Sequence, residues 1–162
     1  MLALHRDVLS TDERAQLRAT LDAAGWSAHD LADRLHLATA NAGADDALFA
    51  RLLDLANRTT RPLRLRAFQW LRLRRGDYQL LKHDARERPP AAHVELIVDL
   101  SAAATGEAEL VYTDGGATLF YVPQLPGSVA VIERPPALLR YQRYLCLRVA
   151  DAEVHRLRLT LA

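Results

Sequence analysis

Two histidines and two carboxylates stand close together near the middle of the chain. His83 and Asp84 are adjacent, and His93 and Glu95 follow a few residues later. Imidazole nitrogens and carboxylate oxygens are the ligands that proteins use for divalent iron or manganese, with positions left open for a substrate. The sequence therefore marks His83 and Asp84 as candidate metal ligands. A structural reading stays open, in which these two residues end a strand at the surface and Glu95 points outward from an amphipathic strand.

Arginines gather in the last part of the chain. Arg140, Arg143 and Arg148 are interleaved with tyrosines, and Arg156 and Arg158 alternate with leucines. Guanidinium groups bind carboxylates in two-pronged salt bridges. Several arginines aimed into one space repel one another unless an anion or a buried carboxylate lies between them. We therefore expect an anion site in this region, although a half-exposed strand also shows this alternation of arginine and leucine.

Two helices are predicted in the first third of the chain. Ser10 and Glu13 have the spacing of a capping box, which predicts a helix over residues 11–24. Leucines at helical spacing predict a second helix over residues 45–57. The periodic signal is weak over residues 27–37, so this segment is expected to form either a short helix or a loop.

From residue 63 onward the apolar period changes to two. Leucine or alanine alternates with arginine over residues 63–74, as in a half-buried strand. Turn signals separate further strand-like runs at residues 94–100, 108–112, 118–122, 128–132, 140–149 and 154–161. Helices followed by many short strands predict an α+β fold with a single domain over residues 1–162. In this interpretation a helical support region at residues 1–62 packs on a jelly-roll core at residues 63–162.

Four segments of the strand-rich part follow one another in a recognisable order, at residues 75–84, 95–101, 106–112 and 122–132. They are similar, in turn, to the strand that leads into a metal-binding His-x-Asp, an apolar strand, a GG-x-L strand and a P-x-x-G-x-L-x-x-F strand. From Leu73 onward the chain thus resembles the double-stranded β-helix core of the 2-oxoglutarate/iron(II) oxygenases, in particular the prolyl-hydroxylase-like branch.

This resemblance implies a set of cofactors and residue roles. Iron(II) would be held by His83 with a nearby carboxylate. Arg158 and Thr160 match an R-x-S/T motif, in which the arginine grips the distal carboxylate of 2-oxoglutarate, and Tyr78 is expected in the same co-substrate site. The implied activity is the hydroxylation of a small-molecule or protein substrate. The metal motif is incomplete, because the carboxylate position of His-x-Asp falls on Ala85.

The second histidine of the metal site is also missing from the place where the resemblance expects it, residues 140–144. Three interpretations follow. Asp84 or Glu95 replaces the carboxylate and His93 or His155 replaces the second nitrogen ligand, or the metal site is lost, or the family assignment is wrong. The competing functional hypothesis is a non-catalytic binding module with an arginine-lined pocket for an anion or a protein.

Composition excludes several other classes of function. The 162 residues carry 21 basic and 20 acidic side chains, so the net charge of +1 gives no positive field for nucleic acid or an anionic membrane. The single cysteine, Cys146, lies in an apolar run and cannot form an internal disulfide. No apolar run reaches the ~18 residues of a spanning helix and no export signal is indicated, so the expected location is the cytoplasm.

Overall fold

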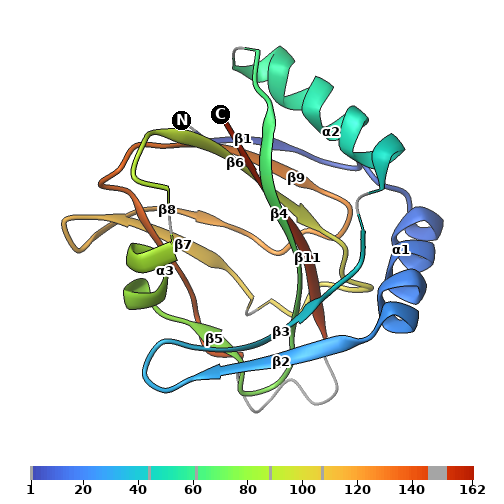
Figure 1. Cartoon of the computed structure of the whole chain (residues 1–162), viewed down its shortest axis with the longest axis horizontal. Coiled ribbons are helices and arrows are strands. Elements are labelled where there is room, and N and C mark those ends of the chain that lie inside the picture. The colour runs from blue at the N-terminus through green and yellow to red at the C-terminus, as the bar shows by residue number, and fades with distance from the viewer. Residues whose placement is uncertain (1, 44, 61, 88, 107, 146–152) are drawn as a thin grey trace.

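The computed structural model describes residues 2–43, 45–60, 62–87, 89–106, 108–145 and 153–162. Within them, three helices pack on one antiparallel sheet of eleven strands (Figure 1). The helices are α1 (Thr11–Ala24), α2 (Asp46–Thr59) and α3 (Leu81–Glu87). The strands are β1 (Leu2–His5), β2 (Trp26–Leu31), β3 (Leu35–Ala40), β4 (Leu65–Leu73), β5 (Tyr78–Gln79), β6 (His93–Asp99), β7 (Leu110–Asp114), β8 (Ala117–Val122), β9 (Val129–Arg134), β10 (Leu139–Gln142) and β11 (Val154–Leu161).

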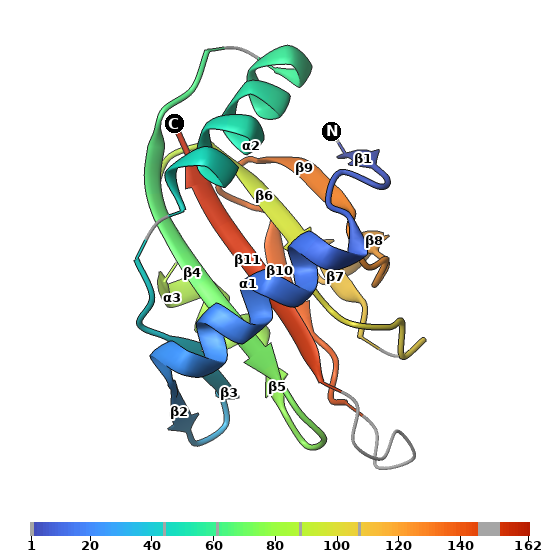
Figure 2. The same cartoon turned by 90° about the vertical axis from the view of Figure 1, so that its right-hand side faces the viewer.

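The sheet curls into a half-barrel. Its strands are paired in the order β1-β9-β6-β11-β4-β3-β5-β10-β7-β8, and β2 pairs with β3 outside this path. Helices α1 and α2 lie on the same outer face of the sheet (Figure 2), whereas α3 contacts β10. The α+β class and the strand-rich second part of the chain, both predicted from the sequence, are confirmed.

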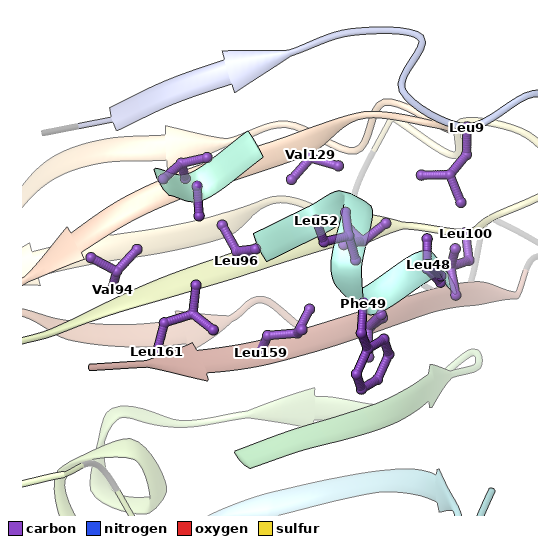
Figure 3. Close-up of a cluster of buried hydrophobic side chains, with 14 of the residues drawn as sticks. Leu9, Leu48, Phe49, Leu52, Val94, Leu96, Leu100, Val129, Leu159 and Leu161 are labelled. Atoms are coloured by element: carbon purple, nitrogen blue, oxygen red, sulfur yellow. The ribbon is translucent and has the colours of Figure 1, made fainter. Parts of the chain in front are cut away.

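The main hydrophobic core lies between helices α1 and α2 and strands β4, β6, β9 and β11 (Figure 3). Leu52 of α2, Leu96 of β6 and Leu157 of β11 are fully buried in it. Because side chains alternate along a strand, the neighbours of these leucines point to the other face of the sheet. The leucines of β11 face this core, so Arg156, Arg158 and Thr160 point to the inner face of the curled sheet. Glu95 of β6 points to the same inner face.

Both predicted helices are present, for the predicted reasons. Helix α1 begins with a complete capping box, in which the Ser10 backbone N–H donates to Glu13 at 2.7 Å and the Glu13 N–H donates to the Ser10 hydroxyl at 3.2 Å. Helix α2 begins after Asp45, whose carboxylate accepts from the Leu48 N–H at 3.0 Å. An apolar face of α2 then packs on the sheet.

The structure corrects the sequence analysis in the first 62 residues. The segment read as a short helix or a loop is the β2–β3 hairpin, and β1 pairs with β9, so the helical support region also contains three strands. Strand β2 is paired only with β3 and is almost entirely exposed. A strand without a buried face is not required to alternate apolar and polar residues. The period-two pattern by which strands are recognised in a sequence is therefore missing from this segment.

Two further expectations concern the second part of the chain. Residues 81–87 form helix α3, so His83 and Asp84 do not end a strand. The strand expected at residues 140–149 is described as β10, which ends at Gln142, while Cys146 and Arg148 lie outside the described residues. None of the described helices combines the length and the apolarity that crossing a membrane requires.

Candidate functional site

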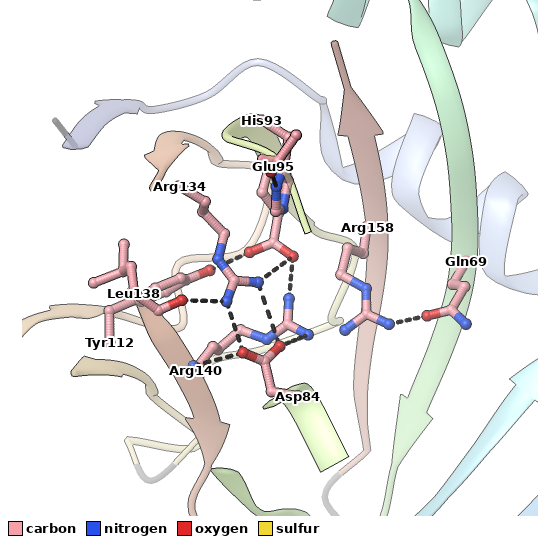
Figure 4. A network of polar contacts seen from close by, with 10 residues as sticks. Gln69, Asp84, His93, Glu95, Tyr112, Arg134, Leu138, Arg140 and Arg158 are labelled. Atoms are coloured by element: carbon pink, nitrogen blue, oxygen red, sulfur yellow. Dashed lines mark hydrogen bonds and ion pairs between the residues drawn. The ribbon is translucent and has the colours of Figure 1, made fainter. Parts of the chain in front are cut away.

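Two carboxylates and two arginines form a buried network where α3 meets β6, β9 and β10 (Figure 4). Asp84, Glu95, Arg134 and Arg140 are each no more than 3% exposed. Asp84 accepts from the Arg134 guanidinium at 2.6 Å and from the Arg140 backbone N–H at 2.9 Å, and it forms an ion pair with the Arg140 guanidinium at 3.0 Å. Glu95 pairs with Arg140, lies 3.5 Å from Arg134 and accepts from the Tyr112 hydroxyl at 2.6 Å.

The network is electrically balanced, with two cations against two anions. Burial alone would raise the pKa of Asp84 and of Glu95, but the guanidinium groups of Arg140 and Arg134 outweigh burial and hold both pKa values below the usual range. Burial also opposes the charge on Arg140, yet Glu95 and Asp84 raise the pKa of Arg140 above its ordinary value. Asp84, Glu95 and Arg140 are therefore charged at neutral pH, and the two carboxylates balance the two arginines.

The donor set at this position does not fit iron(II). Both oxygens of Asp84 accept from arginine, so Asp84 lacks the free carboxylate oxygen that its predicted role as a metal ligand requires. The Glu95 carboxylate is also occupied, because its Oε1 atom pairs with Arg134 and Arg140 and its Oε2 atom accepts from the Tyr112 hydroxyl. In the described ranges, no group of three or more His, Cys, Asp or Glu side chains is arranged to hold a metal ion. The guanidinium group of Arg140 contacts both Asp84 and Glu95, and so takes the position that a metal ion shared by these two carboxylates would need.

Arg158 stands beside this network without a carboxylate of its own. With Thr160, it lines a cavity of about 260 Å³, and both side chains are half-buried. Its guanidinium donates to the Gln69 side chain and, among the residues that the structure describes, forms no ion pair. Burial, assisted by the charge of Arg140, lowers the pKa of Arg158 to about 10. Arg158 is therefore a positively charged group that faces open space at neutral pH.

The structure brings His83 and Arg158 together, as the predicted site requires. Both line a second cavity, of about 450 Å³, between strands β2 to β4 and helix α3. Burial lowers the pKa of His83, so its imidazole is neutral at pH 7. Tyr78, the third residue expected to bind the co-substrate, lines neither cavity, whereas its neighbour Gln79 lines the second. This difference follows from the alternation of side chains along β5.

The two histidines considered as replacement ligands lie apart. His93 lines the smaller cavity, and its Nδ1 atom is 3.1 Å from the Ala91 carbonyl oxygen. His155 is absent from the linings of both cavities and packs edge-on against Trp26, with ring centroids 5.5 Å apart. Sequence reasoning missed Arg134, the second cation of the network, because its neighbours carry no motif.

His155 makes the stability of the protein sensitive to mild acid. Its ring is 3% exposed, neither ring nitrogen has a hydrogen-bond partner among the described residues, and burial lowers the pKa. Below the unfolded-state pKa of about 6.5, His155 binds a proton in the unfolded chain but stays neutral in the folded chain. The free energy of unfolding therefore falls with decreasing pH until the lower folded-state pKa is reached. We expect His155→Leu to flatten the decline in unfolding free energy between about pH 6.5 and 5, measured by urea titration. The exposed His29→Gln variant should keep the wild-type decline, and an unchanged profile in His155→Leu would refute the assignment.

The chain was compared with known proteins. No protein-family model and no curated protein matches it. Its fold is similar to a Burkholderia pseudomallei oxidoreductase of the 2OG-Fe(II) oxygenase family (TM-score 0.75, 14% identity, 99% of this chain and 85% of the other). It is also similar to a Pseudomonas putida prolyl-4-hydroxylase (TM-score 0.69, 16% identity, 99% and 91%). A third similar structure is HygX from Streptomyces hygroscopicus with nickel and 2-oxoglutarate bound (TM-score 0.68, 16% identity, 99% and 82%).

These similarities extend over nearly the whole chain, including the β2–β3 hairpin and both outer helices. They agree with the resemblance that the strand-rich segments showed in the sequence. The protein has the fold of the 2-oxoglutarate/iron(II) oxygenases, with an ion-pair network of Asp84, Glu95, Arg134 and Arg140 in its interior.

Proposed function

We propose that this protein binds a small carboxylate of the 2-oxoglutarate class and does so without iron. The observation that carries the proposal is Arg158, a half-buried, cavity-lining cation with no ion-pair partner in the described part of the chain. Thr160 lines the same cavity and supplies a hydroxyl. The bound 2-oxoglutarate of HygX supports this ligand class, since the two proteins share a fold. The proposal takes the curled sheet to be the double-stranded β-helix expected from the sequence.

The electrostatics of the cavity favour an anion. The neighbouring network is neutral, so the positive charge of Arg158 is not cancelled by Asp84 or Glu95, which are committed to Arg134 and Arg140. A half-buried cation without a counter-ion carries part of the desolvation cost of a charge, and a carboxylate held in a two-pronged salt bridge offsets that cost. The threonine hydroxyl adds a donor at the same position.

Arg158→Met is expected to weaken 2-oxoglutarate binding at least tenfold, because charge-assisted hydrogen bonds to a partly buried guanidinium are among the stronger polar contacts. Isothermal titration calorimetry in buffer with EDTA measures the effect. The matched control is Arg58→Met on α2, whose side chain is exposed and lies in neither cavity. Wild-type protein that does not bind 2-oxoglutarate in EDTA would contradict the proposal.

The second candidate is an iron-dependent hydroxylase, favoured by the fold and by the neutral His83 imidazole in the same cavity as Arg158. Anaerobic addition of iron(II) and 2-oxoglutarate separates the two functions. We expect no charge-transfer absorption in the visible range and the same 2-oxoglutarate affinity with and without the metal. An absorption band that His83→Ala abolishes would replace our proposal with the hydroxylase.

A further inference from the structure

We infer that the site recognises a dicarboxylate by positive charge at both ends, with Arg158 at the inner end of the cavity and Arg66 at its rim. This inference rests on the proposed carboxylate-binding function and deepens it. It assigns to Arg66 the contact with the second carboxylate, and it makes the 2-oxo group and a metal ion unnecessary for binding.

The charges around the 260 Å³ cavity are unbalanced. Among the described residues, four arginines line it, and two of them, Arg134 and Arg140, are neutralised by Asp84 and Glu95. The remaining two are Arg66 and Arg158, and neither forms an ion pair with any described residue. The cavity therefore offers two separate uncommitted cations.

The backbone is irregular at Arg66. Strands β4 and β11 pair so that Thr160 faces Ala67 while the next residue, Leu161, faces Leu65. Arg66 is the extra residue of this β-bulge. A bulge interrupts the alternation of side chains and re-aims one of them, and bulges are common beside functional sites. Four consecutive residues of β4 line the cavity, namely Arg66, Ala67, Phe68 and Gln69, so this stretch of the strand forms part of the cavity wall.

The two cations are separated along the sheet. Arg158 faces Gln69 in the register, and Arg66 lies three residues before Gln69, nearer the start of β4. Three strand residues span roughly 10 Å of backbone. The guanidinium groups lie at the ends of long side chains, so the distance between them can be shorter than this backbone distance. Thr160 lies between them, opposite Ala67. The cations are thus spaced for the two ends of one short-chain ligand.

One acidic side chain opposes these two positive charges. Glu87 of α3 lines the same cavity and is exposed, and it is the one lining carboxylate without an arginine partner among the described residues. One exposed carboxylate against two arginines leaves the cavity positive. The ligand class that fits is a linear dicarboxylate of about the length of 2-oxoglutarate, with or without the oxo group.

The test compares three ligands that differ in one feature each. 2-Oxoglutarate, glutarate and pentanoate are titrated calorimetrically into the full chain in EDTA. We expect glutarate to bind within about threefold of 2-oxoglutarate and pentanoate to bind at least fivefold more weakly, because pentanoate lacks the second charge. Arg66→Gln should weaken glutarate about fivefold and leave pentanoate unchanged, and 0.5 M salt should shrink the glutarate advantage in the wild type.

Arg64→Gln is the matched control, since Arg64 is exposed, lies two residues earlier and does not line the cavity. Equal binding of glutarate and pentanoate, or an unchanged glutarate affinity in Arg66→Gln, would overturn the role of Arg66 while Arg158→Met still identified the carboxylate site. Binding of 2-oxoglutarate but not glutarate would overturn the claim that the oxo group is unnecessary. If none of the three ligands binds, the proposed function itself fails.

Discussion

Replacement of Arg140 by methionine is expected to lower the free energy of unfolding by about 3–5 kcal/mol, the loss typical of a broken buried ion pair. Arg140 contacts both Asp84 and Glu95, and all three side chains are almost fully buried. Methionine fills much of the volume but leaves two buried carboxylates to share Arg134. Urea or guanidinium titration at pH 7 measures the loss.

A second substitution identifies charge as the cause. Glu95→Gln combined with Arg140→Met removes one anion with one cation, so we expect the double variant to be more stable than the sum of the two single losses by about 1–3 kcal/mol. The exposed pair Arg58–Asp54 on α2 is the reference, since Asp54→Ala should cost less than about 0.5 kcal/mol. Additive losses in the buried pair would mean that lost packing, not unpaired charge, accounts for the effect.

Gly127→Ala is expected to destabilise the protein by about 2–4 kcal/mol, through backbone strain and a steric clash together. Gly127 has a φ of +86°, and a Cβ atom there would lie 2.5 Å from the Leu9 carbonyl oxygen. The contact is between two backbone segments, because the Val8 and Leu9 N–H groups donate to the Gly127 carbonyl at 2.9 and 3.1 Å. The residue therefore cannot move without breaking the junction that joins the segment before α1 to the start of β9.

Gly25→Ala separates the two contributions to this loss. Gly25 has a nearly identical φ of +84° but no atom within 4 Å of the added Cβ. It should therefore cost only the conformational penalty of about 1–2 kcal/mol, as measured by thermal or chemical unfolding. Equal losses in Gly25→Ala and Gly127→Ala would show that the close approach to Leu9 contributes nothing.

Local signals made the outer layers of the protein predictable. The Ser10–Glu13 capping box begins α1 where expected, and the leucine stripe of α2 packs on the sheet. The alternation along β11 indicated a strand with arginines on one face, and the structure directs those arginines inward. The expectation that inward arginines need an anion or a buried carboxylate between them holds for Arg140, which lies against Asp84 and Glu95.

The interior was less predictable because it depends on contacts between distant segments. Asp84 and Arg134 are 50 residues apart in the sequence, and no local pattern links them. Arg66 belongs by alternation to the outer face of β4, and only the pairing with β11 reveals the β-bulge at this residue. Helix α3 has only seven residues. This is too short for a helical period of apolar residues to be distinguished from the strand-like pattern of the residues on either side.

The shortness of α3 has a consequence for how the cavities open. An isolated helix of this length has almost no intrinsic stability in water. Helix α3 is therefore stabilised by its tertiary contacts, above all by the ion pairs of the buried Asp84 with β9 and β10. His83 and Glu87 of the same helix form part of the walls around Arg158. Detachment of this one segment would uncover both cavities while the large leucine core stayed folded, but it would also break the buried ion pairs of Asp84 with Arg134 and Arg140.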